Sequence, residues 1–166
     1  MKQIINLGID PGLQVSGFSI LKNDPVLYKS YLIDFGYLKM SSKQSLPERV
    51  GTFYEFFKEK IGQYEVNQIS LETPFLGKNV QAFLKLGYLR GILYLLAHNN
   101  RLMLREFAPR EIKKAIVGYG GAQKDQVATV ILKFFPKLAE VGQTYRHDVT
   151  DALAIGVCGL WNSGNA

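Results

Sequence analysis

The amino-acid sequence predicts an α/β protein in which helices flank a mixed β-sheet. Two observations lead to this prediction. Three apolar segments typical of strands come first, and a short Pro-Gly turn separates the first two. Further strand segments then alternate with helix segments, which is typical of a sheet covered by helices. A chain of 166 residues suits one domain, 1–166, with a single good core.

The three leading strands are defined by apolar runs and turn residues. Residues 4–9 form an apolar run that suits a buried strand. The Pro11-Gly12 turn and the apolar run at 16–21 then predict a hairpin partner for it. Residues 31–38 alternate between apolar and polar, and we expect them to form a third strand at the edge of the sheet.

The next segment, 45–62, reads as a helix. Ser45 and Glu48 have the spacing of a capping box, and Pro47 lies in the first turn, where its missing N–H costs little. Strand and helix patterns follow in turn. The expected elements are a strand at 66–72, a helix at 78–98, a strand at 102–107, and helices at 109–117, 124–135 and 145–160.

Composition limits the classes of protein to which the chain can belong. Hydrophobic residues make up 47% of it, which is typical of a globular protein. No run of about 20 apolar residues and no secretory signal is recognised, so we expect no membrane span. The single cysteine, Cys158, excludes an intrachain disulfide and reads as a core residue. These features favour a cytoplasmic location.

The formal net charge of +6 fits a polyanionic partner such as nucleic acid, although many cytosolic proteins are mildly basic without one. The basic residues gather after the middle of the chain. They are Lys78, Lys85, Arg90, Arg101, Arg105, Arg110, Lys113, Lys114 and Lys124. We expect part of this set to contact DNA phosphates and the rest to form a solvated face.

Four carboxylates suggest a catalytic site. Asp10 and Glu72 end the first and fourth expected strands, and ligands bind at the strand ends of open α/β sheets. Asp148 and Asp151 are spaced i, i+3 and therefore share one face of the last helix. If the two strands are neighbours, three distant segments bring four carboxylates together. Each residue also has a simpler reading, as a turn residue, a solvated strand end or a surface helix charge.

Clustered carboxylates repel one another unless a cation neutralises them. Mg²⁺ or Mn²⁺, which prefer oxygen ligands, would suit such a site. Two ions about 4 Å apart can activate a water molecule and stabilise the leaving oxygen of a phosphodiester. His147 adjoins the cluster and reads either as a general base or as a solvated helix residue.

Five short motifs occur in order along nearly the whole chain. They are GIDPG at 8–12, LETPFLGKN at 71–79, LKLGYLRG at 84–91, IVGYGGAQKDQV at 116–127 and DVTDALAIG at 148–156. Each is weak alone, but in this order and spacing they resemble the RuvC family of Holliday junction resolvases. The resemblance implies a ribonuclease-H-like fold with a mixed five-stranded sheet.

The resemblance also implies a crossover junction endodeoxyribonuclease that acts in recombination and repair. Such an enzyme is a homodimer, depends on Mg²⁺ or Mn²⁺, and resolves four-way DNA junctions by paired nicks. A branch-migration helicase complex is a further partner that the resemblance leaves open.

Individual residues follow from the same resemblance. The four carboxylates match the family's metal-binding and catalytic acids, and Phe75 matches an aromatic placed against bases at the junction centre. Lys113 and Lys124 match basic residues near the scissile region. Some relatives use a histidine just before the last acidic pair, so it stays open which of His147 and Asp148 acts beside the metal.

The expected helix at 78–98 has two apolar stripes, whereas a surface helix needs one. One stripe holds Val80, Phe83, Leu84, Gly87 and Gly91, and the other holds Ala82, Leu86, Leu89, Leu93 and Leu96. One stripe can cover the sheet while the other meets a second copy of the chain. A helix buried between the sheet and its neighbours is the alternative.

Three other functions are weighed against junction resolution. A nuclease of the same fold could cut other branched DNA, such as flaps or forks. A catalytically inactive module could bind branched DNA without cutting it, although the intact acidic set argues against this. An actin-like phosphotransferase shares the strand-Asp-turn-strand opening, but it needs a second domain for which 166 residues leave no room.

Overall fold

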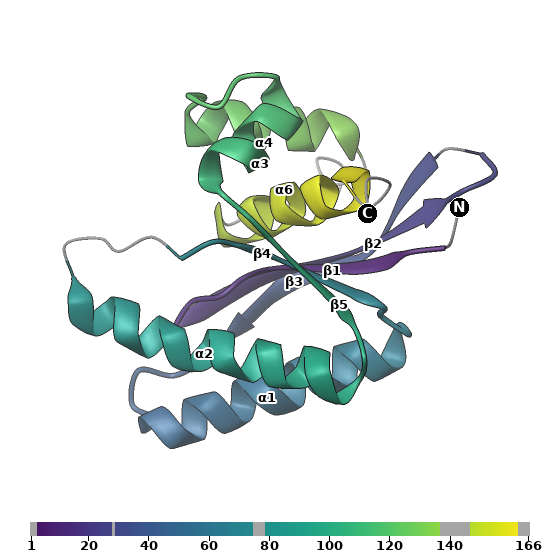
Figure 1. Ribbon diagram of the computed structural model, residues 1–166. Helices are drawn as coiled ribbons and strands as arrows, with labels where there is room; N and C mark the ends of the chain where they lie inside the picture. Colours follow the sequence, from purple (N-terminus) through teal and green to yellow (C-terminus); the bar gives the residue numbers. More distant parts are fainter. Residues whose placement is uncertain (1–2, 28, 75–78, 137–146, 163–166) are drawn as a thin grey trace.

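The computed structural model shows a five-stranded sheet between two layers of helices (Figure 1). It describes residues 3–27, 29–74, 79–136 and 147–162. The strands are β1 (Ile5–Asp10), β2 (Val15–Asp24), β3 (Lys29–Lys39), β4 (Gln68–Glu72) and β5 (Met103–Phe107). The helices are α1 (Leu46–Gln63), α2 (Val80–Asn99), α3 (Pro109–Val117), α4 (Lys124–Phe134) and α6 (His147–Trp161). The expected order of elements is confirmed.

The sheet is mixed, with strand order β3-β2-β1-β4-β5. The first three strands pair antiparallel, whereas β4 runs parallel to both β1 and β5. The edge position expected for β3 is confirmed. Because Ile9 pairs with Leu71, the next residues, Asp10 and Glu72, end neighbouring strands at the same edge of the sheet.

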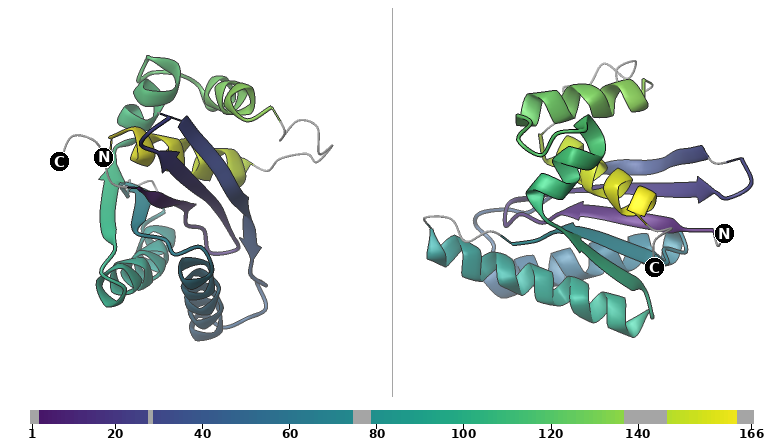
Figure 2. Two further views of the ribbon diagram at one scale, coloured as in Figure 1. Left: turned by 90° about the vertical axis from the view of Figure 1, so that its right-hand side faces the viewer. Right: turned by 45° about the horizontal axis from the view of Figure 1, so that its top comes forward.

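Helices cover both faces of the sheet. Figures 1 and 2 show α1 and α2 on one face and α3, α4 and α6 on the other. The predicted capping box begins α1, since Ser45 and Glu48 each bond to the backbone of the other. Cys158 of α6 is fully buried, as expected, and burial raises the pKa of its thiol to about 11.

Helix α6 lies so close to β1 and β2 that side chains do not fit between them at two positions. A methyl group on Gly8 would lie 2.5 Å from the backbone nitrogen of Gly156 and 2.6 Å from the carbonyl oxygen of Ala152. At Gly17 it would overlap the carbonyl group of Asp148. The absence of side chains at these strand positions therefore sets the height of α6 above the sheet.

Polar side chains from the strands bond to the underside of the same helix. The bonds run from Asn6 Nδ2 to Gly156 O (2.7 Å), from Ser19 Oγ to Ala152 O (2.8 Å) and from Gln68 Nε2 to Gly159 O (3.1 Å). All three donors are at most 1% exposed. Buried polar groups need partners with specific geometry, so these bonds fix the position of α6 along the sheet.

Helix α2 is apolar around most of its surface. In the part of the chain that the structure describes, it is the one helix long and apolar enough to cross a membrane by length and composition, which the sequence analysis did not anticipate. Leu89, Leu93 and Leu96 are nevertheless buried in the core, so one face of α2 covers the sheet. In the other predicted stripe Val80, Leu84, Gly87 and Gly91 are exposed, whereas Phe83 is half-buried.

The close approach of α6 leads to a first prediction. Gly8→Ala is expected to lower the free energy of unfolding by about 1–3 kcal/mol, because the methyl group meets helix backbone. Gly51→Ala in α1 is the control, since nothing lies within 4 Å of its added methyl group, and it should stabilise the protein by about 0.5–1 kcal/mol. Chemical denaturation measures both. Equal stability of the two variants would contradict the packing described.

Candidate active site

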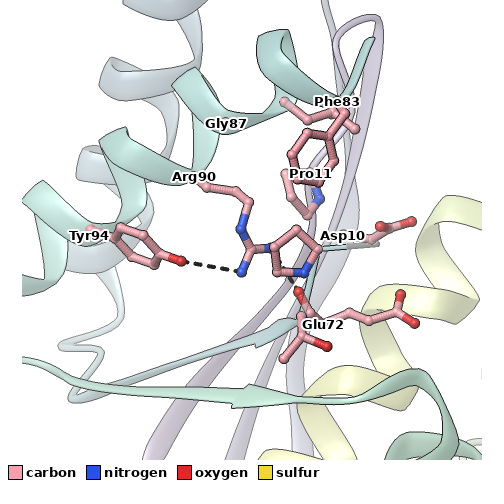
Figure 3. A pocket seen from close by; sticks show the side chains of 10 residues that line it. Asp10, Pro11, Glu72, Phe83, Gly87, Arg90 and Tyr94 are labelled. Carbon is pink, nitrogen blue, oxygen red and sulfur yellow. Dashed lines mark hydrogen bonds between the residues drawn. The ribbon is translucent and has the colours of Figure 1, made fainter. Parts of the chain in front are cut away.

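Asp10 and Glu72 form the sheet side of the candidate site. Each is the last residue of its strand, and the chain leaves the sheet at Pro11 and Thr73. In Figure 3 the carboxylates of Asp10 and Glu72 point in the same direction, away from α2 and toward α6. The two strand ends therefore present both acids to the start of the last helix.

Helix α6 brings the other acids to this edge. Asp148 and Asp151 lie in its first turns, and the contact at Gly17 holds the Asp148 backbone against β2. Asp151 and Glu72 line the same small cavity of about 60 Å³, which Lys113 and Lys124 also line. The three segments predicted to converge thus lie together.

The charges of these carboxylates shift one another's pKa. Burial, followed by the charges of Asp151 and Glu72, raises the pKa of Asp10 from 3.8 to about 7, and Asp148 adds a smaller effect. Burial and Asp151 likewise raise the pKa of Glu72. The positive charge of Lys124 lowers the pKa of Asp10 and of Glu72, but both pKa values remain raised. The cluster therefore carries negative charge that the protein itself does not neutralise.

Lys124 supplies the nearest positive charge. Its Nζ lies 2.8 Å from Oδ2 of Asp151, and this bond raises the pKa of Lys124. The lysine side chain is 71% exposed and that of Asp151 is 24% exposed, so solvent screens the ion pair from the lysine side and weakens it. Lys113 of α3 also lowers the pKa of Glu72, which places a second lysine near the acids.

The donor set suits a hard divalent ion. Asp10, Glu72, Asp148 and Asp151 offer only carboxylate oxygens, the ligands that Mg²⁺ and Mn²⁺ prefer. Within the described ranges, no three His, Cys, Asp or Glu side chains already lie close enough to hold a metal ion. Asp10, Glu72, Asp148 and Asp151 are the residues that would hold such an ion, and Lys124 would compete with it for the Asp151 carboxylate.

The remaining predicted site residues have different outcomes. His147 begins α6 and is exposed, and its carbonyl oxygen accepts a bond from Thr150 Oγ1 (3.0 Å). Asp148 is half-buried and acts on Asp10, but less than Asp151 does. Phe75 and Lys78 lie outside the described residues.

Arg90 has a position that the sequence analysis did not foresee. The sequence analysis grouped Arg90 with basic residues that contact DNA or solvent. In the structure it lies in the middle of α2 and is only 6% exposed. Its guanidinium lines a cavity of about 350 Å³ beside Asp10 and Glu72 (Figure 3). It donates to the carbonyl oxygen of Glu72 (2.7 Å) and pairs with Glu106. An arginine that is buried and paired in this way is not part of the basic surface that meets phosphates.

The chain resembles known proteins over nearly its whole length. The sequence model of the family described as "Crossover junction endodeoxyribonuclease RuvC" matches residues 6–159. A protein of that name from Pelodictyon phaeoclathratiforme is 36% identical over 162 residues, which are 98% of this chain and 82% of the relative.

Solved structures support the fold. A Thermus thermophilus RuvC structure superposes with a TM-score of 0.82 and 22% identity, covering 97% of this chain and 96% of the other. T. thermophilus RuvC in complex with a Holliday junction substrate has a TM-score of 0.81 and 20% identity over the same shares. At these identities the likeness is one of fold.

The raised pKa of Asp10 predicts how metal-free stability depends on pH. Because the folded protein favours the protonated acid, this group's contribution to stability is complete below pH 3.8 and is lost as the pH rises through 7. Asp10→Asn avoids that loss. At pH 8 the variant should be more stable than the metal-free wild type by about 1–3 kcal/mol, and the difference should shrink toward pH 4.

Thermal unfolding in EDTA at several pH values measures this difference. Asp125→Asn, which changes an exposed acid of α4, is the control and should show no such trend. Adding Mg²⁺ at pH 8 should raise the Tm of the wild type but not that of Asp10→Asn. A wild type more stable than Asp10→Asn at pH 8 without metal would refute the electrostatic description.

Proposed function

The chain belongs to the RuvC family of crossover junction endodeoxyribonucleases, and from this premise we propose that Asp10, Glu72, Asp148 and Asp151 form its metal-dependent catalytic centre. The enzyme hydrolyses phosphodiesters in four-way DNA junctions. The observation that carries the assignment of residues is the convergence of three acidic segments on one edge of the sheet, where Asp10 feels the charges of Asp151, Glu72 and Asp148.

The family depends on divalent metal, and we assign Mg²⁺ or Mn²⁺ because every candidate ligand is a carboxylate oxygen. Two ions suit four acids that arrive from two strand ends and one helix. Bound ions of this kind activate water and stabilise the oxygen that leaves the phosphorus. The chain's own contribution is to hold the carboxylates on rigid elements and to keep Asp10 half-buried, where charge interactions are stronger than in water.

Two lysines supply positive charge around the acids. Lys113 and Lys124 line the cavity that contains Glu72 and Asp151, so a phosphate that approaches the acids lies between them. Lys124 pairs with Asp151 through an exposed side chain, and this side chain would also be within reach of a phosphate oxygen. Contacts of this kind give affinity without reading sequence, and they weaken as salt concentration rises.

The homodimer is a further part of the proposal, and we assign its interface to the exposed face of α2. We define this dimer face as Val80, Leu84, Tyr88, Gly91 and Leu95; it adds Tyr88 and Leu95 to the predicted stripe and leaves out Gly87 and Phe83, the latter of which lines the cavity beside Asp10. Its four larger side chains are 47–55% exposed. Gly87 and Gly91 lie in a shallow groove between α1 and α2, where close approach of a second helix is possible. A twofold dimer presents two identical acid clusters to a junction of near-twofold symmetry.

A cytoplasmic location and a branch-migration helicase complex remain predictions. So does the extent of the nuclease domain, which we take as residues 1–166. Flaps and replication forks stay alternative substrates, because the same acids would cleave any phosphodiester that the basic surface presents. An inactive binding module is the remaining alternative, and cleavage assays separate these cases.

Cleavage of synthetic branched DNA tests the activity. In Mg²⁺ the wild type should introduce paired nicks into a four-way junction and should cut a flap or a fork of matched sequence more slowly. Asp10→Asn and Asp151→Asn should each reduce the rate at least about 100-fold, because each removes a charged ligand. Both variants should still bind the junction.

Asp125→Asn serves again as the control and should cut at the wild-type rate. Binding of the junction by the wild type without any cleavage in Mg²⁺ or Mn²⁺ would favour the inactive module. Faster cutting of flaps or forks than of junctions would favour the other branched substrates.

Sedimentation equilibrium at micromolar concentration tests the dimer. The wild type should have about twice the chain mass of 18.7 kDa. Leu84→Glu with Tyr88→Glu should yield monomers, because two charges would be buried without partners in the interface. Val26→Glu is the control, since Val26 is 80% exposed on the β2–β3 hairpin. A monomeric wild type, or a dimer unaffected by the double change, would contradict the assignment.

A further inference from the structure

Arg90 is the one charged residue that is almost fully buried in the part of the chain that the structure describes, at 6% exposure. A buried charge is costly unless it is paired and fully hydrogen-bonded. Arg90 sits in the middle of α2, on the face toward the sheet rather than on the proposed dimer face. Its burial therefore calls for an account that neither DNA binding nor dimerisation supplies.

The guanidinium of Arg90 joins two neighbouring strands. One nitrogen, Nη1, donates to the carbonyl oxygen of Glu72 at the end of β4 (2.7 Å). The other, Nη2, pairs with Oε1 of Glu106 in β5. Tyr94, one turn further along α2, donates its hydroxyl to the same Glu106 oxygen (2.8 Å). Glu106 and Tyr94 thus hold Nη2 of the guanidinium, while Nη1 bonds to the carbonyl of Glu72.

The Glu72 carbonyl lies at the end of β4, where the backbone hydrogen bonds of the sheet end. The last ladder bond there runs from the Thr73 amide to the Phe107 carbonyl (2.8 Å), and the next residue, Pro74, has no amide hydrogen to donate. Backbone at the end of a strand opens more readily than backbone within the sheet. Without Arg90, the peptide that carries Glu72 would be held from one side only.

The direction of approach distinguishes this contact from an ordinary ion pair. Figure 3 shows Arg90 reaching the backbone from the α2 side, while the Glu72 carboxylate points the other way, toward α6. Arg90 bonds to the carbonyl and not to the carboxylate. The arginine can therefore fix the backbone while both carboxylate oxygens stay available to a metal ion.

We propose that Arg90, held by Glu106 and Tyr94, is a positioning residue that sets the place of the Glu72 carboxylate for metal binding. The proposal rests on the proposed function in that Glu72 is a metal ligand. Groups that orient ligands from behind commonly change metal affinity or activity by about 10–100-fold when they are altered.

Arg90→Lys is the main test, because lysine keeps the charge but has no planar fork to bridge Glu72 and Glu106. Glu106→Gln is a milder variant that keeps an acceptor oxygen and removes the charge that holds the fork. Arg105→Lys is the matched control. Arg105 precedes Glu106 in β5, and it donates to the carbonyl of Asn162, at the end of α6, rather than to Glu72.

Two readouts use the protein without DNA. Binding of Mn²⁺, followed by the electron paramagnetic resonance of the free ion, should weaken about 10-fold or more in Arg90→Lys and by a smaller factor in Glu106→Gln. Hydrogen exchange at the Thr73 amide should accelerate about 10-fold or more in Arg90→Lys. In Arg105→Lys both quantities should stay within about 2-fold of wild type.

Global stability is measured in parallel, because loss of a buried arginine also lowers Tm. A lower Tm with unchanged Mn²⁺ affinity and unchanged Thr73 exchange would reduce Arg90 to a structural role and overturn the proposal. Equal decreases in Mn²⁺ affinity in Arg90→Lys and Arg105→Lys would overturn the proposal as well. A wild type that binds Mn²⁺ but cuts no junction would instead sink the proposed function and leave these two readouts to decide the role of Arg90.

Discussion

The close contact of α6 with β1 and β2 is the constraint on which the rest of the structure depends. Gly8 and Gly17 leave no side chain between strand and helix, and buried polar groups such as Ser19 bond to the helix carbonyls. Glycine sets the distance and the hydrogen bonds set the position along the sheet. Together they place the first turns of α6, with Asp148 and Asp151, beside the strand end that carries Asp10.

The packing that brings the acids together also lowers the stability of the metal-free protein. Packing α6 against the sheet buries Asp10 among like charges, which raises its pKa and makes the ionised cluster unfavourable in the metal-free protein. Lys124 relieves only part of this repulsion, through a largely solvated bond to Asp151. A divalent ion held by these acids, as proposed, would relieve more of it, so the repulsion among the carboxylates would favour binding of the ion.

The sequence predicted the parts of the site that follow from strand ends and helix spacing. Asp10 and Glu72 end apolar strands, and Asp148 and Asp151 share a helix face, so their convergence needed β1 and β4 to be neighbours and the start of α6 to lie at the same edge of the sheet. The prediction for Arg90 was wrong because the sequence position of a basic residue does not indicate whether its side chain faces solvent or the core. Its burial depends on Glu106, which lies in a different strand and pairs with it only in the folded chain. The Lys124–Asp151 ion pair could not be predicted from the sequence for the same reason.

Anomalous scattering from crystals soaked in Mn²⁺ tests the central claim most directly, namely that these carboxylates bind divalent ions together. We expect anomalous peaks within about 2.5 Å of carboxylate oxygens of Asp10, Glu72 and Asp151, with the Lys124 side chain moved away from Asp151. Ordered crystals that contain Mn²⁺ elsewhere but show no peak at this edge of the sheet would contradict the account.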